Sequence, residues 1–160
     1  MTEPPVVDAS PLIFLARTRI LQLLTTLGPR IVVPAPVYAE VKAKASDDAA
    51  KLVASASWVV HVPAPAVPAD IARWDLGAGE SAVLAWAQAH SGSVAILDDA
   101  RARQLAQGLR LPLIGTLGIV VRAKRQGRIP LVRPIVESLI AHGMYLSSLL
   151  VKDALAVVGE

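Results

Sequence analysis

The sequence predicts an α/β domain with a mainly parallel sheet, and three observations support this prediction. Short apolar, β-branched runs alternate with helical stretches along the chain, the pattern of a parallel sheet covered by helices. No Gly-, Ser- or Pro-rich linker separates two halves, and no repeat is visible. The length of 160 residues is that of one domain. We expect a single domain over residues 1–160, with a core at about 6–118 and C-terminal helices at about 119–158.

The composition excludes several classes of protein. Hydrophobic residues make up 54% of the chain and charged residues 18%, so disorder is excluded as the main state. The longest uncharged stretch, residues 52–69, contains three prolines and cannot form a membrane-spanning helix. The absence of Cys removes disulfides, thiol nucleophiles and thiolate zinc sites. No secretory signal is visible at the N-terminus, so we expect a cytoplasmic protein that does not span a membrane.

Five apolar runs are predicted as strands. Each is short, rich in Val, Ile or Leu, and followed by a turn or by a helix start. In chain order they are Pro5–Val7, Ile31–Val33, Trp58–Val62, Val94–Leu97 and Leu111–Ile114.

Helices are predicted between and after these strands from their start and stop signals. Ser10 and Pro11 offer an N-cap and a first-turn proline, and Gly28-Pro29 ends the apolar stripe that follows. One helix is therefore expected over about residues 11–27. Ser46 is predicted as a second N-cap, and Gly77–Gly79 leads into a helix. The other expected helices lie at about 34–45, 47–54, 80–89, 100–107, 116–126, 132–142 and 148–157.

Carboxylates occur where a parallel sheet would place its ligands. Asp8 directly follows the first predicted strand, and Asp98 and Asp99 directly follow the fourth. Glu80 heads the apolar face of its helix, and Glu40 does not lie on a clearly polar face. Ligands bind beyond the carboxyl ends of parallel strands, so these acids are expected at one edge of the sheet. Carboxylates gathered in this way repel one another, and Mg²⁺ or Mn²⁺ would relieve that repulsion.

Each acid also has a simpler structural explanation. Asp8 can form an Asx turn with Ser10, and Asp98-Asp99 can cap the next helix. Glu80 can interact with a helix dipole, and Glu40 can be a solvated surface residue. Only their common position at one sheet edge favours a functional site.

The basic residues are unevenly distributed, although the net charge is only +3. Residues 100–136 hold eight basic side chains and no acid. Such a segment is either a set of solvated helix faces or a surface that attracts a polyanion. Only 4% of the residues are aromatic, so base stacking is not expected to dominate any binding of nucleic acid.

Other enzyme motifs fit the sequence less well. Residues 77–82 match a dinucleotide-binding pattern by letters, but no strand precedes them. The three histidines show no metal-ligand spacing. A phosphoacceptor receiver domain would carry its acid pair after the first strand, where this chain has a single Asp. A haloacid-dehalogenase-type phosphatase would have a second Asp at position 10, which is Ser here.

An ordered set of motifs resembles the PIN domain family, and more narrowly a PIN-like branch long catalogued as a domain of unknown function. The similarity extends from about Val6 to Gly159. The motifs that carry it are Asp8-Ala-Ser10-Pro-Leu-Ile13, Val33-Pro34 followed by Val37-Tyr-Ala-Glu40-Val41, Leu76-Gly77-x-Gly79-Glu80, Leu97-Asp98-Asp99-x-Arg101-x-Arg103 and Gly115-Thr116-Leu-Gly118.

The resemblance implies a three-layer α/β/α fold and a metal-dependent ribonuclease. It implies Asp8, Glu40, Glu80 and Asp99 as catalytic residues, which bind Mg²⁺ or Mn²⁺ together with the neighbouring Asp98. Many relatives have Asp where this chain has Glu80, and Thr where it has Leu97. Ser10 or Thr116 is the alternative source of the missing hydroxyl.

The implied partners are RNA, a second copy of the chain and a small antitoxin, because many relatives are toxins of toxin–antitoxin pairs. The residues expected to hold the RNA backbone are Arg101, Arg103, Arg122, Lys124 and Arg125. A non-catalytic PIN-like module that binds RNA or a protein partner is the alternative function. A homodimer is also expected from the apolar surplus of residues 12–27 and 144–158, which one core-facing stripe would not absorb.

Overall fold

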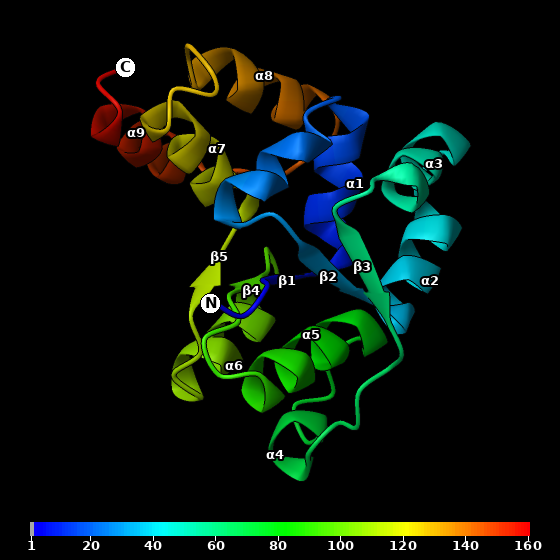
Figure 1. The fold of residues 1–160 in the computed structure, drawn as a ribbon. Helices are drawn as coiled ribbons and strands as arrows, with labels where there is room; N and C mark the ends of the chain where they lie inside the picture. The colour runs from blue at the N-terminus through cyan, green and yellow to red at the C-terminus, as the bar shows by residue number, and fades with distance from the viewer. Residues whose placement is uncertain (1) are drawn as a thin grey trace.

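The computed structural model describes residues 2–160 and contains a five-stranded sheet in which every strand is parallel to its neighbours. The strand order is β3-β2-β1-β4-β5, which confirms the predicted α/β class (Figure 1). The strands are β1 (Val6–Val7), β2 (Ile31–Pro34), β3 (Val59–Val62), β4 (Ala95–Ile96) and β5 (Leu113–Ile114).

Helices occupy most of the remaining chain, and most begin within about two residues of the predicted positions. The helices before β4 are α1 (Ala9–Arg17), the 3₁₀ helix η1 (Leu21–Leu27), α2 (Ala35–Lys44), α3 (Asp47–Ser55), α4 (Ala69–Ala72) and α5 (Ala78–Ala89). Those after β4 are α6 (Ala100–Gly108), α7 (Thr116–Arg125), α8 (Arg133–Ala141) and α9 (Ser148–Val157).

The elements form three layers. Figure 1 shows α5 and α6 on one side of the sheet and α1, η1 and α7 on the other. The strands contribute fully buried residues such as Val6, Ile31 and Ile96 to a core that extends into both helix layers. The chain leaves β1 for β2 on one side and returns to β4 on the other, so the strand order reverses at β1. This reversal point is where open α/β sheets bind ligands.

The predicted first helix is wrong in two respects. The observed helix begins two residues earlier than predicted, at Ala9, so that Asp8 and not Ser10 occupies the N-cap position. It also ends at Arg17, because Arg19 adopts a left-handed backbone with φ of 62°. The amides of Arg19 and Ile20 donate to the carbonyls of Ala16 and Leu15, which is the Schellman pattern of a helix C-terminus. Glycine usually occupies that position, so no stop signal is visible at Arg19.

The break after Arg17 changes where the apolar residues of this segment lie. Leu12 and Leu15 of α1 and Leu23 and Leu24 of η1 are all buried within the chain. Helix α7 covers η1, and the side chains of Arg122 and Gln126 donate hydrogen bonds to the carbonyl of Thr26. Two segments with different orientations, and not one continuous helix, present these residues to the core, so their burial does not require a second chain.

Helices α7, α8 and α9 pack around a smaller apolar cluster of their own, to which Leu117, Val136, Leu139 and Leu155 contribute. The carboxylate of Glu160 accepts hydrogen bonds from the amides of Val132 and Arg133, so it caps the start of α8. Across residues 2–160, no helix has the length and apolar character that crossing a membrane requires.

Candidate active site

A cavity of about 620 Å³, here called the acidic cavity, opens at the carboxyl edge of the sheet. Its position follows from the topology, because β1 and β4 are neighbours and both end there. Five carboxylates line it, from four different elements or their flanking loops. They are Asp8 after β1, Glu40 of α2, Glu80 of α5, and Asp98 and Asp99 after β4. The structure thus brings together every acid that the sequence placed at this edge.

Asp8 is the deepest of these acids. It is only 2% exposed, and its Oδ1 atom has no hydrogen-bond partner among the described residues. Burial, and then the charge of Glu80, raise the pKa of Asp8 to about 7, with smaller contributions from Glu40 and Asp98 in the same direction. The Ala9 amide acts in the opposite direction. The Oδ1 atom of Asp8 therefore lacks a positive or donating partner.

Asp98 is held rigidly at the end of β4. Its Oδ1 accepts a hydrogen bond of 2.8 Å from the amide of Thr116, and its Oδ2 accepts one of 2.6 Å from the Thr116 hydroxyl. Thr116 is fully buried as the first residue of α7. Thr116 was one of the two candidates for the hydroxyl that Leu97 does not supply. Its hydroxyl donates to Asp98 and orients that carboxylate.

Asp99 lies in the same cavity but serves a second purpose. Its Oδ2 accepts a hydrogen bond of 2.9 Å from the amide of Ala102, so Asp99 is the N-cap of α6. Asp98, and not Asp99, is among the charges that raise the pKa of Asp8. Of the two neighbouring acids, Asp98 is therefore the one that interacts more strongly with the buried carboxylate.

Glycine at position 79 allows two of the carboxylates to approach each other. A Cβ atom on Gly79 would lie 3.0 Å from Oδ1 of Asp8 and 3.3 Å from Oε2 of Glu40. The second oxygen of Glu40, Oε1, forms a 2.8 Å salt bridge with Lys44 one turn along α2. Glu40 thus has one oxygen at Lys44 and the other directed to the space above Gly79.

The chemistry of this cavity fits a hard divalent cation. Its carboxylates supply oxygen ligands only, which Mg²⁺ and Mn²⁺ prefer, and the unpartnered Oδ1 of Asp8 would gain a ligand role. In the side-chain arrangement of residues 2–160, however, no three acids or histidines already converge on one point. The carboxylate oxygens of the cavity are therefore suitable ligands for such a cation, but their arrangement in this structure is too open to coordinate one.

The five basic residues predicted to hold RNA do not gather at the acidic cavity. Arg101 donates to the carbonyl of Trp74 and Arg103 to that of Leu97. Arg122 bonds to η1, and Lys124 donates to the Pro130 carbonyl. Arg125 is exposed near the end of α7, about one helix length from Thr116.

Four charged or aromatic residues that line the cavity were not predicted: Phe14, Arg17, Lys44 and Tyr145. Lys44 had a visible signal, because it lies four residues after Glu40 on the same helix face. Arg17 is seven residues after Ser10, which also lines the cavity, so both lie on one face of α1. Tyr145 lies in the loop between α8 and α9 and is 88% exposed, and no periodic pattern reaches it.

Fold and site together define an α/β/α domain with a carboxylate centre where the strand order reverses. A family model described as a PIN domain matches residues 4–160, and the chain belongs to this family, whose members are in general nucleases. Comparison with curated proteins and with solved structures gave no match. The expected resemblance is therefore confirmed at the level of the family.

We predict that the metal-free protein loses stability as the pH rises from about 4 to about 7. The pKa of Asp8 is about 7 in the folded chain, against an ordinary value of 3.8, so the folded state retains a proton that the unfolded state has released. The loss is on the order of a few kcal/mol. Urea unfolding in EDTA from pH 4 to 8 measures it. Asp8→Asn should flatten this part of the profile, and an unchanged profile would contradict the prediction.

We also predict that Gly79→Ala weakens metal binding. Alanine normally stabilises a helix by about 1 kcal/mol relative to glycine, but this methyl group would crowd the oxygens of Asp8 and Glu40. We expect the affinity for Mn²⁺, measured by calorimetry, to fall by roughly tenfold, without the usual gain in melting temperature. Gly108→Ala on α6 is the matched control, because its Cβ would contact nothing within 4 Å. Equal effects of the two variants would contradict the role of Gly79.

Proposed function

We propose that the protein is a ribonuclease that hydrolyses RNA phosphodiester bonds with Mg²⁺ or Mn²⁺. The observation that carries this proposal is the buried, unpartnered Oδ1 of Asp8 among four other carboxylates. Membership in a family of nucleases supports hydrolysis of a phosphodiester, and the oxygen-only donor set supports the cation.

Each carboxylate has a distinct part in this proposal. Asp8 and Asp98 would hold the cation, since the first is buried without a partner and the second is fixed by Thr116. Glu40 of α2 and Glu80 of α5 would complete the ligand set. Asp99 would contribute through its free Oδ1 while it caps α6. When bound, the cation supplies charge neutralisation at the phosphate and lowers the pKa of a coordinated water.

The basic residues of the cavity have a separate task. Lys44 neutralises one oxygen of Glu40, which reduces the repulsion that an incoming phosphate meets. Arg17 lies on the rim formed by α1 and is available for a non-bridging phosphate oxygen.

A non-catalytic module that binds RNA or a protein partner is the second candidate. The observation that favours it is the open arrangement of the acids, of which no three converge within the described part of the chain. The bond between Glu40 and Lys44 also keeps one potential ligand engaged. The two functions differ in one measurable property, which is cleavage of RNA that depends on a divalent cation.

Substitution of the central acids provides that test. We expect Asp8→Asn and Asp98→Asn to reduce Mn²⁺-dependent cleavage of a labelled RNA by at least roughly 100-fold, with the fold intact by circular dichroism. Glu137→Gln is the control: it removes the same single negative charge from an exposed position on α8. It should leave the cleavage rate within about twofold of the wild type. Cleavage that persists in both Asp variants and in EDTA would refute the proposal. Binding without cleavage by the wild-type protein would support the second candidate.

We further propose that the protein is a homodimer and the toxin of a toxin–antitoxin pair. The apolar surface that remains exposed lies mainly on α9, where Leu149, Leu150 and Val157 are each at least half exposed. This surface, and not the first helix, is the place to expect an interface of at least roughly 1,000 Å². A small reading frame next to the coding sequence would identify an antitoxin candidate.

Sedimentation equilibrium at micromolar concentration tests the dimer. We expect twice the chain mass of 16.8 kDa for the wild type, and a monomer for Leu149→Lys because the charge would be buried in the interface. Val67→Lys, in the exposed loop before α4, is the control and should remain a dimer. A wild-type mass near 16.8 kDa would exclude the dimer.

A further inference from the structure

A second cavity, of about 430 Å³, adjoins the acidic cavity. It lies between the end of α1, helix α3 and the residue that follows α8, and Arg17 lines both cavities. Its charged side chains are Arg17, Arg19 and Lys51, with His142 beside them and Asp48 as the single acid. We call it the basic cavity.

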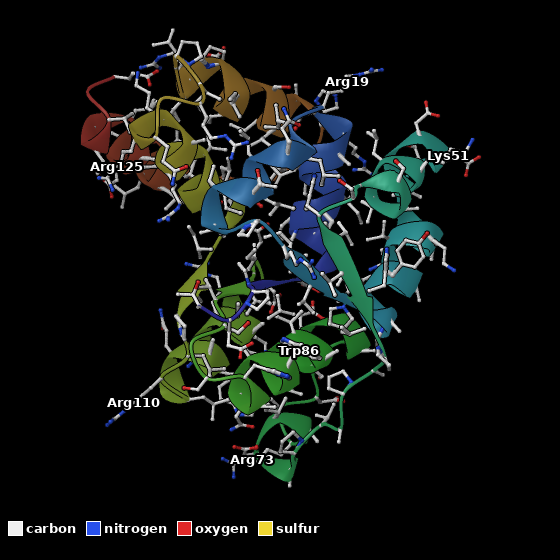
Figure 2. All side chains as sticks on the ribbon, in the orientation of Figure 1. Arg19, Lys51, Arg73, Trp86, Arg110 and Arg125 are labelled. Carbon is white, nitrogen blue, oxygen red and sulfur yellow. The ribbon has the colours of Figure 1, made fainter. Side chains whose placement is uncertain are left out.

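The basic side chains of this cavity take part in no ion pair within the described part of the chain. Over residues 2–160, the ion pairs are Lys44–Glu40 and Lys124–Glu160, and neither involves this cavity. The guanidinium of Arg17 lies over the ring of Phe14, 5.6 Å from its centre, and Arg19 and Lys51 are exposed. Figure 2 shows both of these side chains extending outward, Arg19 beyond the end of α1 and Lys51 from α3.

Backbone geometry does not explain the arginine at position 19. Its φ of 62° is the left-handed conformation that glycine adopts without cost. The left-handed backbone at the C-terminus of α1 therefore does not require an arginine. The Arg19 side chain adds a positive charge to the cavity.

We propose that the basic cavity binds backbone phosphates of a single-stranded nucleic acid whose scissile phosphate lies in the acidic cavity. Arg17, which lines both cavities, would contact the strand at the junction. The inference rests on the proposed nuclease function and differs from the sequence expectation, which assigned the phosphates to Arg101, Arg103, Arg122, Lys124 and Arg125.

Two features support this assignment. A polyanion that approaches five carboxylates needs positive charge beside them, and the two cavities meet at an arginine. Tyr145, 88% exposed on the rim of the acidic cavity, offers an aromatic face to an unpaired base, as proteins that bind single strands do.

The chain contains a matched pair of arginines for the test. Arg110 has a φ of 58° after α6, and the amides of Arg110 and Leu111 repeat the hydrogen bonds seen after α1. Its side chain lies at the opposite end of the molecule from Arg19 (Figure 2). Arg19→Gly and Arg110→Gly thus remove the same charge from the same backbone conformation, and both variants should fold.

Binding of a labelled single-stranded RNA is measured by fluorescence anisotropy in EDTA over a series of salt concentrations. We expect Arg19→Gly and Lys51→Gln each to weaken binding by roughly threefold or more at low salt, and to reduce the salt slope by about 0.7, the value for one phosphate contact. Arg110→Gly should change neither quantity. Double-stranded RNA of the same length should bind more weakly.

Four outcomes would overturn the inference: no binding by the wild type, unchanged affinity in both cavity variants, an equal loss in Arg110→Gly, or equal binding of duplex RNA. Cleavage assays on the same proteins separate this inference from the proposed function. Manganese-dependent cleavage by the wild type, with unchanged binding in the cavity variants, refutes the basic cavity alone. Selective loss of binding in Arg19→Gly, with no cleavage by the wild type, refutes the nuclease and keeps the binding site.

Discussion

The repulsion among carboxylates around Asp8 is the constraint on which the rest of this structure depends. A carboxylate that is 2% exposed, without a partner for Oδ1, is an unfavourable feature of a folded chain unless a ligand compensates for it. The fold nevertheless keeps it at the point where the strand order reverses. Glycine at position 79 lets Glu40 approach it, and Asp98 is fixed by two hydrogen bonds. Under the proposed function, a bound cation would relieve the repulsion that destabilises the metal-free protein.

The acids of the cavity differ in how firmly the chain holds them, and this difference suggests an order of assembly. Asp8 and Asp98 follow neighbouring strands and are positioned by the sheet itself. Glu40 and Glu80 extend from helices, and Glu40 is engaged with Lys44. Under the proposed function, Asp8 and Asp98 would be preformed ligands of the cation, and Glu40 and Glu80 would close around it. Exchange of Lys44 for a cation at Glu40 would be part of that closing step.

The sequence predicted the sheet and the position of the acids because both follow from periodic patterns. A strand followed at once by Asp fixes the place of that Asp in a parallel sheet, and this applies to Asp8 and to Asp98-Asp99. The end of α1 could not be predicted in the same way. The apolar periodicity continues from Leu12 to Leu27, and the Schellman turn at Arg19 carries an arginine in place of the expected glycine. After the break, the side chains of Arg122 and Gln126 bond to η1, a tertiary contact that no local sequence signal reports.

The same break accounts for the difference between the basic residues that the sequence pointed to and the basic cavity that the structure forms. Charge density along the chain drew attention to residues 100–136, but Arg122 and Lys124 hydrogen-bond to carbonyls of η1 and of the loop before α8. These cations stabilise the layer that covers η1. In contrast, the turn after Arg17 directs Arg19 toward α3, where Lys51 lines the same cavity. Residues more than 30 positions apart in the sequence thus form the basic cavity, which only the folded arrangement of α1 and α3 reveals.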